Sequence, residues 1–147
     1  MDIHEKLQIR SEIESMLVDF WHDVDHHWGH AAHEYYTQDG TFMNTVGKAR
    51  RGREQIREFY ASRQDRGARV ARHVIANLRV EVRDRDNADA DWVLLLYARD
   101  GEPVLASEPA ILIADVHDEC VRESDGRWRY RARTLRALFK SDTPTTT

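Results

Sequence analysis

The sequence contains a single cysteine, Cys120, among 147 residues, which excludes an internal disulfide and is typical of a reducing compartment. No apolar run approaches the ~20 residues that a membrane-spanning helix requires. The first residues, Met1 to Glu5, contain no basic segment that leads into an apolar one, so no secretory signal is expected. These absences predict a cytoplasmic protein without a membrane partner.

The sequence also lacks the short motifs that mark nucleotide-dependent enzymes and serine hydrolases. It has no phosphate-binding loop, no dinucleotide fingerprint and no Ser/His/Asp arrangement. The net charge of -4 provides no general attraction for phosphate backbones, so nucleic acid is not an expected partner. We therefore expect a small-molecule ligand and no cofactor.

Four histidines near the end of the first apolar segment raise the question of a metal site: His22, His26, His30 and His33. A spacing of four residues places two ligands on one face of a helix. Gly29 is expected to break the helix between them, and no carboxylate or cysteine spacing completes a known site. We predict a solvated polar face and no metal.

Three helices are predicted in the first half of the chain. Apolar residues recur every three or four positions from Ile13 to Trp28, which predicts one long amphipathic helix with Trp21 and Trp28 mostly buried. A short second helix is predicted over 30–36, after Gly29. A third is predicted over 53–66, and Gly67 is a suitable residue for its C-terminal cap.

After Gly67 the apolar residues alternate, which predicts strands. We expect strands over 74–83, 92–98, 104–122 and 128–138, with Pro109 at a bulge or edge, and a short early strand over 41–44. Helices followed by such strands predict an α+β fold: a curved antiparallel sheet wrapped on three N-terminal helices, cone-shaped, with an internal pocket. We assign 1–140 to a single domain and 141–147 to a disordered tail.

The order of several short motifs resembles the nuclear transport factor 2-like superfamily, within it the SnoaL-like group with scytalone dehydratase. The matching segments, within residues 9–139, are Asp25-His26-His27-Trp28, Tyr36-Thr37-Gln38-Asp39-Gly40-Thr41-Phe42, Gly52-Arg53-Glu54-Gln55-Ile56-Arg57-Glu58-Phe59-Tyr60, Arg72-His73-Val74-Ile75-Ala76-Asn77 and Asp125-Gly126-Arg127-Trp128. The resemblance implies a cystatin-like cone. It does not fix a reaction, because this fold hosts dehydratases, isomerases, cyclases and non-catalytic binders.

Asp25 matches the helix aspartate that transfers protons in scytalone dehydratase-like enzymes. A carboxylate among tryptophans is desolvated, which makes it a usable base. Asp23 is a rival, because the spacing from Asp25 to Trp28 is one residue shorter than in those enzymes. The alternative for Asp25 is an exposed helix-end carboxylate or a cap for the second helix.

His73 matches the strand histidine of the same enzymes, and imidazole is suited to moving protons near neutral pH. Simple alternation places it on the same face as Asn77 and Arg79, which look solvated. A bulge between His73 and Asn77 would bring His73 to the pocket face. The resemblance thus implies Asp25 and His73 as the catalytic pair.

Asp115 interrupts an apolar run and is a further candidate for the pocket, near the place where scytalone dehydratase has a second strand histidine. If the hairpin turns about Asp125, Asp115 lies opposite Leu135, and Glu119 lies opposite Arg131 in a cross-strand charge ladder. The resemblance also suggests wall residues for the pocket: Trp21, Phe42, Phe59, Tyr60 and Trp92.

Two functional hypotheses follow. The first is a small cofactor-free enzyme, a lyase or isomerase of the SnoaL-like type, that dehydrates, isomerises or cyclises a hydrophobic carbonyl-bearing molecule. The second is a non-catalytic ligand-binding module, or a β-subunit-like partner of a ring-hydroxylating oxygenase. In either case the strands that are apolar on both faces predict a homodimer through the open face of the sheet.

Overall fold

The computed structural model of the chain describes residues 1–44 and 47–145. Its first helix, α1 (Ile3–His27), begins at Asp2, whose carboxylate accepts a hydrogen bond from the Glu5 amide at 2.9 Å. The Glu5 carboxylate in turn accepts one from the Asp2 amide at 3.0 Å, which completes a capping box. The predicted apolar stripe is buried from Ile13 to Val24, and Ile9 extends it by one more turn. The buried residues of α1 are Ile9, Ile13, Met16, Leu17, Phe20, Trp21 and Val24.

The strands form one six-stranded sheet in the order β2-β1-β6-β5-β4-β3. All neighbouring pairs are antiparallel except β1 and β6, which are parallel, so the sheet is not purely antiparallel as predicted. Their bounds are β1 (Tyr36–Met43), β2 (Ala49–Arg51), β3 (Arg69–Asp84), β4 (Asn87–Asp100), β5 (Leu112–Arg122) and β6 (Trp128–Lys140).

The described residues contain two α-helices, not the predicted three. The segment predicted as a second helix is a four-residue 3-10 turn, η1 (Ala32–Tyr35). Trp28 and Gly29 both adopt left-handed backbone conformations, with φ of 59° and 70°, which ends α1 and leaves too few residues before β1. The predicted third helix divides into α2 (Arg53–Ala61) and a 3-10 turn, η2 (Gln64–Arg66).

Two other predictions in this region are corrected. Trp28 is only half-buried, because its left-handed backbone places it at the exposed end of α1. The strand predicted from Val104 begins at Leu112, and 101–111 forms a loop that contains Pro103 and Pro109. Proline has no backbone N–H for the ladder, so pairing with β4 resumes only at Ile111, whose N–H bonds to the Leu96 carbonyl at 2.8 Å.

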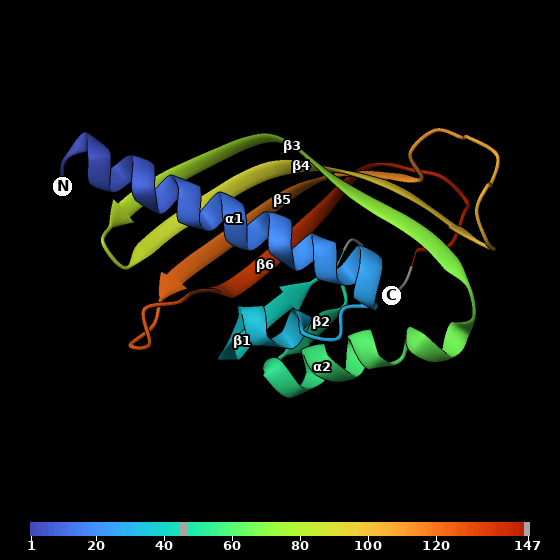
Figure 1. Ribbon diagram of the computed structural model, residues 1–147, viewed down its shortest axis with the longest axis horizontal. Coiled ribbons are helices and arrows are strands. Elements are labelled where there is room, and N and C mark those ends of the chain that lie inside the picture. Colours follow the sequence, from blue (N-terminus) through green and yellow to red (C-terminus); the bar gives the residue numbers. More distant parts are fainter. Residues whose placement is uncertain (45–46, 146–147) are drawn as a thin grey trace.

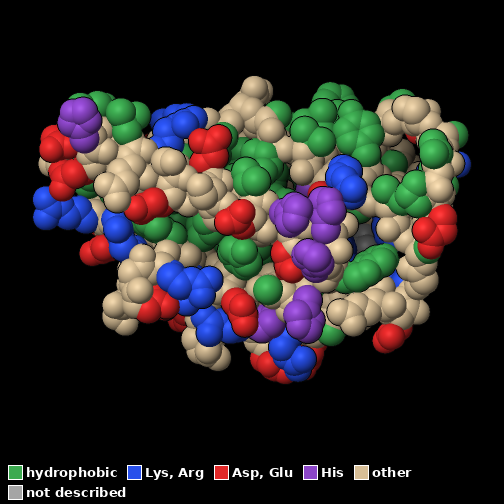
Figure 2. All heavy atoms as spheres, in the orientation of Figure 1, with side chains coloured by type: hydrophobic (Ala, Val, Ile, Leu, Met, Phe, Trp, Pro, Cys, Tyr) green, Lys and Arg blue, Asp and Glu red, His purple; other side chains and the backbone are tan. Residues whose placement is uncertain are grey.

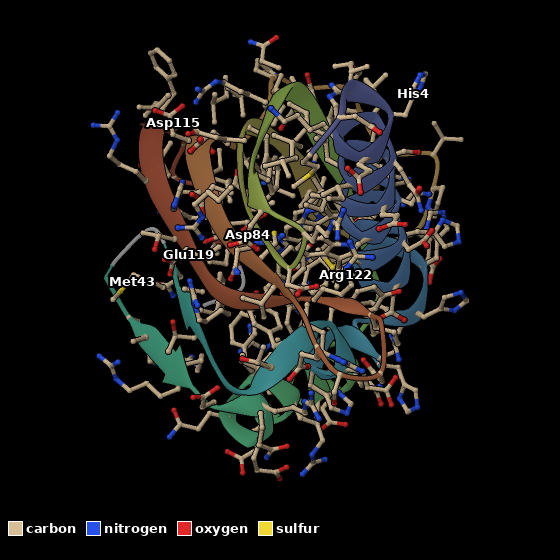
Figure 3. All side chains as sticks on the ribbon, turned by 90° about the vertical axis from the view of Figure 1, so that its left-hand side faces the viewer. His4, Met43, Asp84, Asp115, Glu119 and Arg122 are labelled. Carbon is tan, nitrogen blue, oxygen red and sulfur yellow. The ribbon has the colours of Figure 1, made fainter. Side chains whose placement is uncertain are left out.

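The molecule has two layers, with α1 lying across one face of the curved sheet (Figure 1). The core lies between them, because alternate β4 side chains from Ala88 to Ala98 point toward the helix and are buried. No described element covers the opposite face, where Asp115 lies (Figure 3). Among the described residues, no helix is long and apolar enough to span a membrane.

Candidate active site

His73 reaches the helix-facing side of the sheet because β3 contains a bulge. Asn77 has a left-handed backbone conformation (φ 54°), and the pairing with β4 shifts register between Ala76 and Arg79. His73 therefore faces α1 before the bulge, and Leu78 packs against the core after it. The bulge was expected between His73 and Asn77 and lies slightly later, between Ala76 and Arg79.

Asp25 projects from the last turn of α1 and contacts His73 through both carboxylate oxygens. Oδ1 lies 2.6 Å from His73 Nδ1, and Oδ2 accepts a hydrogen bond from the His73 backbone N–H at 2.9 Å. Each side chain is only 6% exposed. Because a carboxylate can only accept, a neutral His73 donates its Nδ1 proton and keeps a lone pair on Nε2. Asp25 thus fixes both the position and the tautomer of the imidazole.

Trp21 holds the other side of the imidazole. Its ring stacks on that of His73 with centroids 4.1 Å apart and planes 13° from parallel. Trp21 also meets the edge of Trp92 at 6.0 Å, which ties it to the sheet. The His73 ring is therefore restrained in its plane by a hydrogen bond and across its face by an indole.

Burial lowers the pKa of His73 below its usual value of 6.5. The hydrogen bond and the charge of Asp25 act in the opposite direction, but the loss of hydration outweighs them, and the charges of Arg63 and Arg133 add to the lowering. His73 is consequently neutral at pH 7, the state in which Nε2 accepts a proton.

Two cavities lie beside the pair. The His73 cavity, of about 50 Å³, is lined by His73, Trp21 and mainly apolar side chains such as Phe59 and Leu96. The Asp25 cavity, of about 130 Å³, is lined by Asp25, Trp28 and a set of arginines. Arg63 and Thr145 line both, so a ligand that spans them would contact the histidine and the arginines together.

The model of the SnoaL-like domain family matches residues 5–134, most of the chain. The chain belongs to this family. The resemblance to the SnoaL-like group is thereby confirmed. No curated protein matches the sequence.

Solved structures share the fold of this SnoaL-like domain over nearly its whole length. A proposed scytalone dehydratase from Novosphingobium aromaticivorans has a TM-score of 0.84 at 19% sequence identity. The aligned region covers 98% of this chain and 93% of the dehydratase chain. ActVI-ORFA from Streptomyces coelicolor has a TM-score of 0.75 at 20% sequence identity, and the aligned region covers 88% of this chain and 97% of ActVI-ORFA. A Catenulispora acidiphila protein in complex with S-DNPA has a TM-score of 0.72 at 21% sequence identity, and the aligned region covers 89% of this chain and 94% of that protein. At these identities the likeness shows the fold alone.

The SnoaL-like domain places the predicted wall residues in two groups. Trp21, Phe42, Phe59 and Tyr60 line the His73 cavity. Trp92 does not line either cavity, because its indole N–H turns away to donate to Asp118 Oδ2 at 2.9 Å.

The two further acidic candidates lie elsewhere. Asp23 Oδ2 accepts a hydrogen bond from the Ala31 amide at 3.0 Å, so Asp23 holds the turn after α1 and does not line the cavities. Asp115 points to the open face and pairs with Arg136 at 3.0 Å, contrary to the expected pocket position. One extra residue in β6, Arg131, shifts the hairpin register opposite Glu119 and Cys120, so that Asp115 lies opposite Arg136 and not Leu135.

The predicted solvated histidines lie together on the surface at the end of α1, where Figure 2 shows a group of histidine side chains. His22, His26 and His30 are exposed, and the rings of His22 and His26 stack at 4.2 Å. His33 departs from the prediction, because it lies in η1, is half-buried and has a buried Nδ1 atom. Within 1–44 and 47–145 no group of three or more His, Cys, Asp or Glu side chains has the geometry of a metal site.

A buried ion pair beneath Trp21 was not predicted. Arg133 and Asp118 are fully buried, and their contacts are 2.6 Å from Nε to Oδ1 and 2.9 Å from Nη2 to Oδ2. The Arg133 guanidinium also lies 5.2 Å from the Trp21 ring centroid. Regular alternation along β6 would place Arg133 on the same face as Arg131, and the bulge at Arg131 turns Arg133 inward instead.

Proposed function

We propose that this SnoaL-like domain is a cofactor-free acid/base catalyst that acts on a hydrophobic carbonyl-bearing molecule. The observation that carries the proposal is the 2.6 Å contact between His73 Nδ1 and Asp25 Oδ1, buried beside a cavity that His73 lines. Asp25 orients the imidazole, and Nε2 is left as the base.

The chemistry follows from a neutral imidazole in a water-poor site. His73 Nε2 removes a proton from the carbon beside the carbonyl, and the imidazolium that forms is stabilised by Asp25. The same proton then returns to one of three places: a hydroxyl group that leaves as water when its carbon–oxygen bond breaks, another carbon of the conjugated system, or the oxygen of a second carbonyl whose carbon has bonded to the enolate carbon to close a ring. Dehydration, isomerisation and cyclisation are thus alternative fates of one intermediate.

The walls of the site indicate the class of substrate. Phe42, Phe59, Leu94, Leu96 and Leu135 line the His73 cavity, so they favour an apolar ring or chain. The structural neighbour solved with S-DNPA and the one proposed to be a scytalone dehydratase support a small organic ligand for this chain as well.

The first test is proton exchange, because it needs no knowledge of the natural substrate. We expect the protein to accelerate exchange of the α-hydrogens of 2-tetralone, 2-indanone or 1,3-cyclohexanedione in deuterated buffer, measured by proton NMR. The rate should exceed that given by free imidazole at the same concentration. Absence of exchange with all three ketones would contradict the proposal.

A non-catalytic ligand-binding module, or the β-subunit-like partner of an oxygenase, is the second candidate function. The structural neighbour solved in complex with S-DNPA favours it, because that complex supports ligand binding without indicating a reaction. Calorimetric binding of the same ketones without exchange would assign the chain to this second class.

We further propose that the protein is a homodimer through the open face of the sheet. The strand registers align Val74, Leu95, Ile113 and Phe139 in one row on this face. Val74 is 42% exposed and Phe139 is 69% exposed, which leaves an apolar row in water.

Sedimentation tests the dimer. The wild-type protein is expected to sediment as a dimer at micromolar concentration, and Phe139→Glu as a monomer, because a carboxylate in the row would be desolvated on pairing. Val104→Glu is the matched control, since Val104 is 99% exposed in the loop before β5 and lies off the row. A wild-type monomer would rule out this interface.

A further inference from the structure

Arg63 occupies a position that neither the fold nor the Asp25–His73 pair requires. It follows α2 and precedes η2, and it lines both the His73 cavity and the Asp25 cavity. Its guanidinium carbon lies 5.6 Å from the Phe59 ring centroid and 5.4 Å from that of Tyr60. A cation is therefore held against aromatic walls at the place where the two cavities share their lining.

Within residues 1–44 and 47–145 this cation has no anionic partner. No carboxylate lies within ion-pair distance of Arg63, and its buried Nε atom has no hydrogen-bond acceptor. Buried donors without an acceptor are rare, because the free energy lost when water is removed from the donor is not offset by a new hydrogen bond. The same burial lowers the pKa of Arg63, although a guanidinium remains charged at neutral pH.

The surroundings of Arg63 carry more positive than negative charge. The arginines that line the Asp25 cavity are Arg63, Arg66 and Arg69, and its carboxylates are Asp25 and Asp100. Both carboxylates already have partners, since Asp25 binds His73 and Asp100 accepts from Arg69 at 2.9 Å. An anion that enters this cavity would meet unpaired donors and no unpaired carboxylate.

Packing on the aromatic rings does not by itself explain Arg63. Arg133 provides the comparison, because it lies closer to aromatic rings, 4.1 Å from Tyr130, and is still neutralised by Asp118. At Arg133 the structure supplies a carboxylate, whereas no described carboxylate pairs with Arg63. At Arg63 the corresponding position faces the cavities.

We infer that Arg63 binds the anionic oxygen of a hydrophobic ligand, either a carboxylate or the enolate formed during proton transfer; the enolate role rests on the function proposed above. When His73 Nε2 takes the proton, the C–H electron pair forms a carbon–carbon double bond and the carbonyl π pair moves to oxygen. Arg63 donates to the resulting oxyanion. A charge-assisted hydrogen bond to a guanidinium would stabilise it more than the neutral ketone.

Calorimetric titration with a matched pair of probes, 2-naphthoate and 2-naphthamide, tests this inference. The two share their ring system and differ in charge. At pH 8, where His73 is neutral, the wild-type protein should bind 2-naphthoate at least about tenfold more tightly, as expected for one charge-assisted hydrogen bond. Arg63→Gln should remove this preference and leave the affinity for 2-naphthamide within about twofold.

Two variants serve as controls. Arg57→Gln changes an exposed arginine on α2 that pairs with Glu54, and it should keep the preference for 2-naphthoate. Arg63→Lys keeps the charge but not the planar fork, and it should retain part of the preference even if Arg63→Gln fails to fold. Equal affinity of the wild-type protein for the two probes, no binding of 2-naphthoate, or a preference that survives in Arg63→Gln would each overturn the inference.

The outcome is separable from that of the proposed function. If His73→Gln keeps the preference for 2-naphthoate while the wild-type protein shows no proton exchange, the anion site stands and the catalytic proposal fails. If exchange is observed and the anion preference is absent, Arg63 has no such role and the catalytic proposal stands.

Discussion

His73→Gln is expected to reduce the α-proton exchange rate by ~10²–10⁴-fold, the usual contribution of a positioned general base. Glutamine retains a hydrogen-bonding group near Asp25 but has no basic nitrogen. The variant should unfold at nearly the same urea concentration as the wild-type protein. The measurement is the exchange rate per enzyme molecule under saturating ketone.

The pH profile distinguishes this role from a structural one. Because burial lowers the pKa of His73 below 6.5, the base is already neutral at pH 7, and its protonation begins only at more acidic pH. The wild-type rate should therefore stay level from pH 8 to below about pH 6.5 and then fall as the imidazole is protonated. In His73→Gln this acidic decline should be absent.

The chain contains its own control for this experiment. His117 also contacts an aspartate, Asp91, at 2.7 Å, but that pair is about half exposed on the open face, and its hydrogen bond raises the pKa of His117. His117→Gln should leave exchange unchanged. An equal loss in His117→Gln and His73→Gln, or no loss in either, would refute the assignment of the base.

Asp118→Asn is expected to lower the free energy of unfolding by about 3–5 kcal/mol, the usual effect of removing one partner from a buried ion pair. Asp118 and Arg133 are both fully buried, and Asp118 also accepts the Trp92 N–H at 2.9 Å. The amide leaves the Arg133 charge without a counter-ion in a site that water does not reach. Urea denaturation followed by tryptophan fluorescence measures the change.

Asp115→Asn on the same strand is the matched control. Asp115 also pairs with an arginine, at 3.0 Å, but both side chains are exposed, so its loss should change stability by less than about 1 kcal/mol. If Asp118→Asn proved as mild as Asp115→Asn, the buried pair would not be a determinant of stability. The double variant Asp118→Leu with Arg133→Met should recover much of the loss, because it removes both charges.

The sequence predicted those parts of the fold that depend on local periodicity. The apolar repeat of α1 places Trp21 and Val24 in the core, and the resemblance pairs Asp25 with His73, which are in contact in the structure. Failures occurred where single backbone conformations decide the outcome. The left-handed residues Trp28 and Gly29 removed a predicted helix, and a bulge at Arg131 in β6 moved Asp115 away from Leu135.

The arginines also show that local sequence patterns do not predict which side chains become buried. Periodicity alone does not distinguish Arg133, which is buried with Asp118, from Arg131, which is exposed, because the register of the hairpin separates them. The helical pattern predicted over 53–66 places Arg63 on the same side as Phe59 and Tyr60, but it indicates no role for the charge. Its importance depends on which distant side chains lie around it, and no local pattern contains that information.

Because of the bulge at Asn77, the number of residues between His73 and Leu78 is more strictly constrained than the identity of those residues. His73 and Leu78 face the same layer although they are five positions apart, an odd number that regular alternation would place on opposite faces. Loss or gain of one residue between them would turn either the histidine or the apolar half of the strand outward. When the SnoaL-like family is aligned, a gap placed between 73 and 78 therefore implies a different site, whereas gaps in the loop over 101–111 leave the site unchanged.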